Sequence, residues 1–237
     1  MRGCFGAALN LFDISAIVWL AIIACFVLLW QSNDSAAASS SDWVATALIA
    51  SVSMVPFPAL SAAALSVVGL WGIFTARTGS PVRRASIILL SLSAYFFWGR
   101  VILALGAGPM LSADAQFVSW FSGLSATGNV LTSVDGTKFV IAPGCSSLHG
   151  ISLALVLWTT TLAWFAWPVT SRQIVFLALA IVATVAVNGF RLAMIGWNPE
   201  HFDYWHIGDG AILFGWVALI AVTGVLYLGM HHDLRKA

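Results

Sequence analysis

Long apolar runs with at most one charged residue each constrain the fold of this chain more than any other feature. Five of them lie at about 12–30, 86–106, 147–168, 173–191 and 210–230. Each is near the roughly 20 residues that a helix needs to cross the hydrocarbon of a bilayer. Only 8% of all residues are charged, against about a quarter in soluble domains. The chain is therefore predicted to be an all-α, polytopic transmembrane helical bundle.

A further apolar stretch, at 43–76, is interrupted by Pro56 and Pro58. Because proline ends or kinks a helix, this stretch is either one crossing with an interfacial segment or a tight pair of short helices. The bundle is therefore expected to have six or seven spans. A chain of 237 residues fits one integral membrane domain, residues 1–237. Its N-terminus lacks the small-residue cleavage site of a signal peptide, so the first span is expected to be retained.

The placement of basic residues predicts the orientation in the membrane. Six of the ten fall on one side if the spans alternate, namely Arg77, Arg83, Arg84, Arg172, Arg235 and Lys236. The positive-inside rule assigns that side to the cytoplasm. The segment at about 108–146 then becomes an extracytoplasmic insertion. A net charge of +1 gives no reason to expect a nucleic-acid partner.

The insertion contains two local patterns. Residues 112–126 read as a short amphipathic helix whose apolar face carries Phe117, Trp120, Phe121 and Leu124, a pattern typical of a helix at the membrane interface. Residues 130–141 then alternate around an Asp-Gly pair, which predicts a β-hairpin with a two-residue turn. The hairpin leads directly to Gly144 and Cys145.

Cys145 is the leading candidate nucleophile. It follows Pro143 and Gly144 and comes just before a predicted span. If it caps that helix, its sulfur lies near the positive end of the helix dipole, where a thiolate is favoured. Cys25 lies inside an apolar run and is expected in the core, and Cys4 is uninformative. The three cysteines suggest neither a disulfide framework nor a metal site, and we expect no cofactor.

Two further reactive side chains share the predicted membrane depth of Cys145. Arg191 ends the span at 173–191, and His206 precedes the span that begins near 210. A cysteine, an arginine and a histidine from three separate places therefore meet the same outer face of the predicted bundle. This coincidence favours an active site over three unrelated interfacial residues.

These motifs resemble the exosortase/archaeosortase family. The resemblance is carried by the residues Cys145-Ser146-Ser147-Leu148-His149, Asn188-Gly189-Phe190-Arg191 and His206-Ile207-Gly208-Asp209-Gly210, with Phe214 after them. It covers about residues 108–230, which form the family-like catalytic region. The family usually has Cys-Ser-Gly-Leu/Ile-Arg, so Ser147 and His149 depart from its pattern.

The resemblance implies a membrane cysteine transpeptidase of a bacterial or archaeal plasma membrane. Its partners would be exported proteins with a C-terminal transmembrane sorting signal, such as a Pro-Glu-Pro motif followed by a helix and a basic tail. Cys145 would attack the scissile carbonyl and form a thioester, Arg191 would stabilise the oxyanion, and His206 would act as general base and acid. The site would face the extracytoplasmic side, within membrane lipid.

Other polar or small residues are candidates for supporting roles. Asn188 lies one turn before Arg191 and could hold it or the substrate backbone, and Gly210 could allow close helix approach. Asp209 could orient His206, while His149 and His201 are rival bases. Arg100 lies within an apolar run, where it could receive an acidic group or a lipid phosphate.

Two alternatives remain open from the sequence. Hydrolysis by the same thiol, or acyl transfer without transpeptidation, would use the same thioester. A non-catalytic transporter or scaffold with buried polar residues would not need Cys145 at all. In the preferred interpretation, the helix of the substrate docks beside the spans at 86–106 and 147–168.

Overall fold

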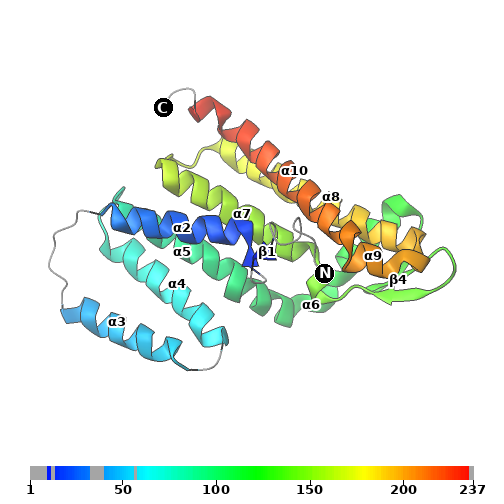
Figure 1. The fold of residues 1–237 in the computed structure, drawn as a ribbon, viewed down its shortest axis with the longest axis horizontal. Helices are drawn as coiled ribbons and strands as arrows, with labels where there is room; N and C mark the ends of the chain where they lie inside the picture. Colours follow the sequence, from blue (N-terminus) through cyan, green and yellow to red (C-terminus); the bar gives the residue numbers. More distant parts are fainter. Residues whose placement is uncertain (1–9, 12–13, 33–39, 56–57, 235–237) are drawn as a thin grey trace. The chain divides into compact units, whose positions relative to one another are not determined.

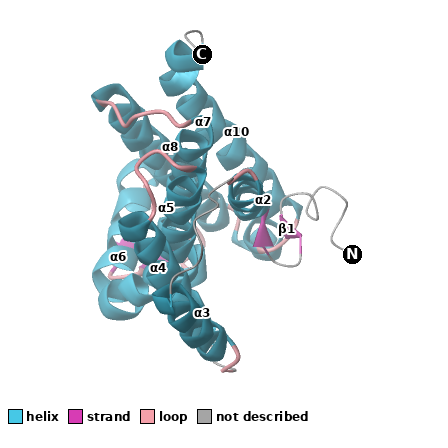
Figure 2. Ribbon diagram, turned by 90° about the vertical axis from the view of Figure 1, so that its left-hand side faces the viewer, coloured by secondary structure: helices cyan, strands magenta, loops and turns pink. Residues whose placement is uncertain are grey.

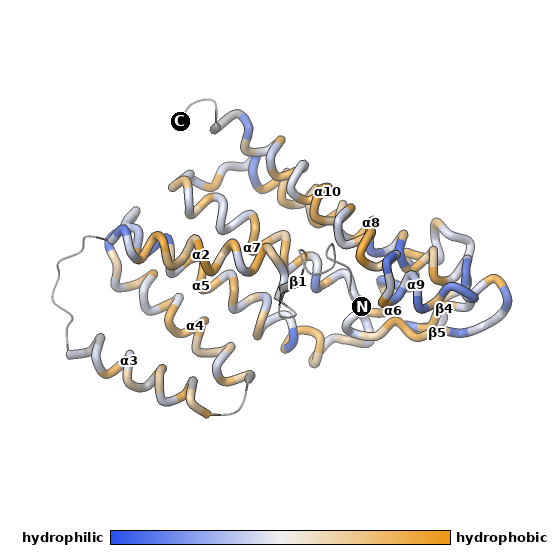
Figure 3. Tube along the Cα trace, in the orientation of Figure 1, coloured by the Kyte–Doolittle hydropathy of each residue, from blue (hydrophilic) through white to orange (hydrophobic). Residues whose placement is uncertain are grey.

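The computed structural model describes residues 10–11, 14–32, 40–55 and 58–234, and helices make up most of this part of the chain (Figure 2). The prediction of an all-α membrane protein is confirmed at the level of fold class. The α-helices in chain order are α2 (Ala16–Trp30), α3 (Ser40–Ser53), α4 (Pro58–Thr75), α5 (Pro81–Ser93), α6 (Gly99–Ser122), α7 (Ser147–Phe165), α8 (Ser171–Trp197), α9 (Phe202–His206) and α10 (Asp209–Leu234) (Figure 1). Hydrophobic residues predominate along α8 and α10 (Figure 3).

Four helical stretches are long and apolar enough to cross a membrane among the described residues. They are Pro81–Ser122, Ser147–Phe165, Ser171–Trp197 and Asp209–His231. Ala16–Trp30 and Ala59–Thr75 are apolar but shorter. The count of six or seven crossings therefore stays a prediction.

The apolar stretch at 43–76 forms two helices. The first, α3, ends at Ser53, and α4 begins at Pro58, where the missing N–H of proline costs no intrahelical hydrogen bond. One helix that crosses beside an interfacial helix and a pair of short helices would both have this form, so the two arrangements that the sequence left open stay predictions. Residues 56–57, which include Pro56, lie outside the described part.

The predicted break at residue 106 is confirmed in its position, but the second helical segment follows Gly106 without a gap and ends at Ser122 instead of occupying 112–126. A five-residue π-helical segment, η1 (Ala94–Trp98), joins α5 to α6, and α6 continues through Pro109 to Ser122. Gly106 has a non-helical backbone, with φ −128° and ψ 21°, and this distortion accommodates the ring of a proline three residues later. The helix kinks where the sequence suggested that it ends. It stops at Gly123, whose φ is +76°.

The chain divides into two compact units, and each is described by itself. Unit 1 comprises residues 1–16, 101–154 and 169–237, and unit 2 comprises residues 17–100 and 155–168. The single domain predicted for residues 1–237 stays a prediction.

In unit 2, α4 packs closely against α5. A Cβ atom on Gly69 would lie 2.9 Å from the backbone nitrogen of Leu90, and one on Gly72 would meet the side chain of Ser86. Cys25 is buried, as predicted, and its Sγ lies 3.7 Å from the carbonyl oxygen of Ala85. Small residues therefore set the approach of these helices, as is common in membrane bundles.

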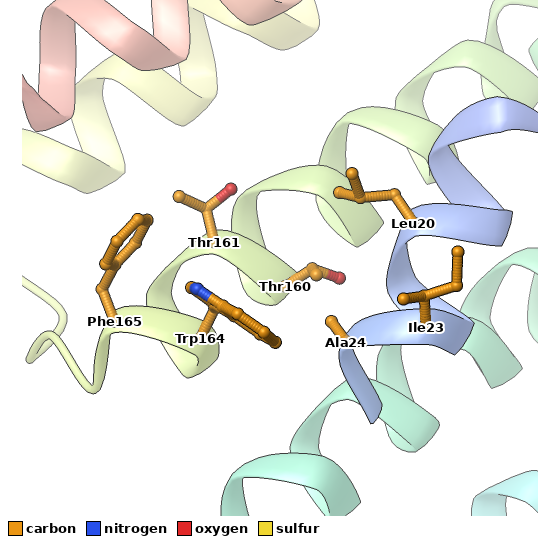
Figure 4. Close-up of a pocket in the computed structure, with 7 residues that line it drawn as sticks. All are labelled: Leu20, Ile23, Ala24, Thr160, Thr161, Trp164 and Phe165. Atoms are coloured by element: carbon orange, nitrogen blue, oxygen red, sulfur yellow. The ribbon is translucent and has the colours of Figure 1, made fainter. Parts of the chain in front are cut away.

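The C-terminal end of α7 also lies in unit 2. Arg84 Nη1 donates to the carbonyl oxygens of Ala163, at 3.2 Å, and Trp164, at 3.0 Å. A cation at this position satisfies carbonyl groups that the end of a helix leaves open. An apolar pocket of about 320 Å³ lies between α2 and this part of α7, lined by Leu20, Ile23, Ala24, Thr160, Thr161, Trp164 and Phe165 (Figure 4).

In unit 1, α8 and α10 run side by side (Figure 1), and a Cβ on Gly229 would lie 2.6 Å from that of Phe176. The buried core of this unit joins α6, α8 and the small sheet, and consists of Leu111, Ala115, Val118, Leu124, Leu131, Ile141, Leu192, Ala193 and Ile195. The sheet is thereby fixed against the helices by its buried side chains.

That sheet has the order β3–β4–β5, with β3 at Ser125–Thr127, β4 at Val130–Thr132 and β5 at Lys138–Val140. Both pairings are antiparallel, and Leu131 lies opposite Phe139. Five residues, 133–137, connect β4 to β5, whereas the sequence suggested a two-residue turn. Gly136, at φ +85°, donates to the carbonyl of Ser133, so the Asp-Gly pair closes a longer turn with its glycine in the left-handed region. A second two-stranded sheet pairs β1 (Asn10–Leu11) with β2 (Ile14–Ser15).

Candidate active site

Cys145 is the last residue of a single 3₁₀ turn, η2 (Pro143–Cys145). Its backbone N–H donates to the carbonyl of Ala142 at 2.8 Å, and its side chain is half-buried. The prediction that Cys145 caps α7 is wrong by one residue, because the side chain of Ser146 accepts from the N–H of Leu148 at 3.2 Å and α7 begins at Ser147. A serine accepting from an N–H two residues on is a typical N-cap. The thiol therefore lies just ahead of the helix.

Cys145 and His206 are in direct contact. The Sγ atom of Cys145 and the Nε2 atom of His206 are 3.3 Å apart. An unprotonated Nε2 accepts the thiol proton in this geometry, and a protonated one donates to a thiolate. His206 is the last residue of α9, and its ring lies 4.9 Å from that of Phe202 between centroids. Two residues separated by 61 positions thus form a pair suited to proton transfer.

Asn188 holds the segment that carries the thiol. Its Nδ2 donates to the carbonyl oxygen of Cys145 at 2.9 Å and to Oγ of Ser147 at 3.2 Å. The sequence suggested that this amide binds Arg191 or a substrate. In the structure it binds the backbone of the nucleophile itself, which limits movement of Cys145 relative to α8.

Arg191 lies one turn after Asn188 on α8 and is half-buried. Its Nε atom is buried and has no hydrogen-bond partner among the described residues. Its charge interacts electrostatically with both Cys145 and His149. A buried guanidinium without a complete set of partners is costly, and negative charge arising at Cys145 would offset that cost.

Asp114 is a component of the site that sequence reasoning missed. Its Oδ2 accepts from the backbone N–H of Ser147, the first residue of α7, at 3.1 Å. A carboxylate at this position satisfies an otherwise open N–H and opposes the positive end of the helix dipole. Asp114 therefore offsets part of the positive end of the dipole that the sequence assigned to Cys145. A detectable signal existed, because Asp114 shares a helical face with the buried residues Leu111 and Val118.

The other predicted support residues lie in different environments. His149 is exposed in the first turn of α7, and Asp209 is exposed at the start of α10. In the described part of the chain, no hydrogen bond joins Asp209 to His206. His201, the rival base, pairs instead with Glu200 at 3.1 Å. Arg100 belongs to unit 2, where it is exposed and interacts with Tyr95.

Gly210 provides a close approach to α9. A Cβ atom there would lie 2.5 Å from Cε3 of Trp205 and 2.8 Å from Cε1 of Tyr204. Trp205 immediately precedes His206, so displacement of its ring would disturb the histidine that contacts Cys145. A larger residue at position 210 would therefore press on α9 next to His206.

We expect Gly210→Ala to slow alkylation of Cys145 by iodoacetamide at neutral pH by roughly tenfold. The added methyl group forces the rings of α9 to move, because interiors tolerate little overpacking, and His206 then loses its position beside the thiol. Gly224→Ala on the same helix is the matched control, since nothing lies within 4 Å of a Cβ there. Equal alkylation rates in the two variants would show that Gly210 does not position His206.

Among residues 10–11, 14–32, 40–55 and 58–234, no group of three or more His, Cys, Asp or Glu side chains could hold a metal ion. The geometry of the described site is that of a thiol, an imidazole and a guanidinium. Such a set can form a nucleophile, move a proton and neutralise an oxyanion.

Comparison with known proteins gives one match. The family described as transmembrane exosortase matches residues 12–223 of the 237 in the chain. No curated protein and no solved structure matches the chain. The family match extends well before the region at 108–230 that carries the motifs.

Proposed function

Because the chain belongs to the transmembrane exosortase family, we propose that it cleaves a C-terminal sorting signal of exported proteins and transfers the new carboxyl end to an acceptor. The observation that carries this proposal is the 3.3 Å contact between Cys145 Sγ and His206 Nε2. A thiol beside an imidazole is a nucleophile with its base already in place.

In the first step, His206 takes the proton of the Cys145 thiol and the sulfur attacks the scissile carbonyl carbon. The carbonyl oxygen becomes an oxyanion, and the charge of Arg191 stabilises it. The tetrahedral intermediate then collapses, the carbon–nitrogen bond breaks, and His206 returns the proton to the leaving amine. The product is a thioester between Cys145 and the shortened protein.

In the second step, an acceptor nucleophile attacks the thioester carbonyl. His206 removes the proton of the nucleophile, and the sulfur leaves as the Cys145 thiolate. An amine acceptor gives transfer, and water gives hydrolysis. The same residues serve both outcomes, so the choice depends on which nucleophile reaches the thioester.

The site is proposed to face the extracytoplasmic side of the plasma membrane. Cys145 precedes the N-terminal end of α7, while Arg84 contacts carbonyl groups at the opposite end of the same helix. Arg77 and Arg83 precede Arg84 in the sequence. The positive-inside rule assigns the arginine-rich end to the cytoplasm, which leaves the thiol on the outer face.

The proposal is tested by mass spectrometry of a reporter protein incubated with membranes that contain the wild-type chain. The reporter ends in a Pro-Glu-Pro segment, an apolar helix and a basic tail. Loss of the tail with an added mass at the new C-terminus is the expected result. A free carboxylate would favour the hydrolase alternative, and an uncut reporter would favour a non-catalytic transporter or scaffold.

A further inference from the structure

The strand β5 has one unpaired edge. It is the last strand in the order β3–β4–β5, and in the described part of the chain it pairs with β4 alone. An edge strand presents a row of open N–H and C=O groups that can pair with another chain. The question is which main-chain groups of β5 are open.

The register between β4 and β5 shows which main-chain groups of β5 are open. The N–H of Ser133 donates to the carbonyl of Thr137, and the N–H of Ile141 donates to the carbonyl of Asn129. Residues of an antiparallel pair alternate between those that exchange hydrogen bonds and those whose main-chain groups point away. Thr137 and Ile141 therefore face β4, and so does Phe139 between them. Lys138 and Val140 direct their N–H and C=O groups to the open edge.

This open edge leads directly to the nucleophile. Cys145 follows Val140 by five positions. β5 also contacts the helix that carries the base. The ring of Phe139 lies 6.4 Å from that of Phe202, and the ring of Phe202 lies against that of His206. β5 thus adjoins both the segment that carries the thiol and the helix that carries its base.

We propose that the residues of the sorting signal just before the scissile bond bind as an added strand, parallel to β5, on its open edge. The inference rests on the proposed function. The ligand class is an extended peptide recognised mainly through its main chain, as in other cases of strand addition. The direction is parallel because β5 leads through Cys145 into the apolar helix α7, and the substrate likewise leads from its signal into an apolar helix.

The opposite edge of the sheet provides an internal control. Ser125 and Thr127 of β3 pair with Thr132 and Val130 of β4, whose main-chain groups face β3. Ala126 therefore directs its N–H to the other open edge. The open edge of β3 is two strand spacings, or about 10 Å, farther from a peptide bound on β5 than the open edge of β5 is.

The test replaces Val140 with proline. Val140→Pro removes an outward N–H without removing any hydrogen bond to β4, and proline is tolerated at such edge positions. We expect kcat/KM for the reporter to fall by about tenfold, which corresponds to about 1.4 kcal/mol. Ala126→Pro removes an outward N–H from the opposite edge of the sheet and should process the reporter at the wild-type rate.

Disulfide crosslinking tests the strand geometry independently. The protein carries Val140→Cys with Cys4, Cys25 and Cys145 replaced by alanine, and the reporter carries single cysteines at successive positions before the scissile bond. We expect crosslinks at alternate positions, because side chains of a strand alternate between two faces. A cysteine at exposed Thr127 should give none.

The outcomes separate the two proposals. If the wild-type chain cuts the reporter, while Val140→Pro cuts it equally fast and the crosslinks do not alternate, strand addition is overturned and the proposed function stands. If the wild-type chain leaves the reporter uncut, the proposed function fails and this inference fails with it.

Discussion

Cys145→Ala is expected to reduce processing of the reporter by about 10⁴-fold or more, which leaves no product detectable by mass spectrometry. Removal of a nucleophile has an effect of this order in enzymes that form a covalent acyl intermediate. The variant should still fold, because the half-buried side chain changes little in volume and the backbone hydrogen bonds of η2 do not involve the sulfur.

The proposed thioester at Cys145 can be trapped, which provides a second test of the nucleophile. Hydroxylamine added to the wild-type reaction should attack the thioester and leave a hydroxamate at the new C-terminus of the reporter. Cys25→Ala is the control, since that thiol is buried in unit 2 and should give the same hydroxamate as the wild type. Normal processing by Cys145→Ala would remove the basis for the whole assignment.

His206→Ala is expected to lower kcat by about 10²–10⁴, the usual contribution of a general acid and base. The variant removes the group 3.3 Å from the thiol, so alkylation of Cys145 at neutral pH should slow as well. Both readouts are needed, because a purely structural defect would not slow thiol alkylation in proportion to turnover.

Two other histidines test whether this role belongs to His206. His201→Ala should behave as the wild type, because that side chain is exposed and pairs with Glu200. His149→Ala decides between the candidate bases. If it abolishes turnover while His206→Ala does not, His149 is the base and the contact seen in the structure is incidental to the chemistry.

The site could be predicted from the sequence only as far as its reactive groups. Cysteine, arginine and histidine are chemically distinctive, and their placement next to apolar runs identified Cys145, Arg191 and His206 as candidates. The role of Asn188 could not be predicted, because its two hydrogen bonds reach residues more than 40 positions away. Asp114 was missed because a single acid in a polar-looking insertion resembles a solvated surface residue.

The fold was predictable where hydrophobicity alone decides it. The apolar stretches beginning near 147, 173 and 210 became α7, α8 and α10 with small shifts in their ends. The stretch through 86–126 was predictable only in part: Gly106 and Pro109 indicated the position at which the regular helix is interrupted. The sequence did not show that the second segment would follow directly at a kink, because a proline can either end a helix or kink it.

The unpartnered Nε atom of Arg191 has a consequence for rate as distinct from binding. An interaction accelerates a reaction only if it is stronger in the transition state than in the resting enzyme and substrate. A donor already engaged at rest must first give up its partner, which cancels part of the gain. This donor has no partner to release among the described residues, so its interaction with the proposed oxyanion would be gained only as the charge forms, and the benefit would appear in kcat, with little change in substrate affinity.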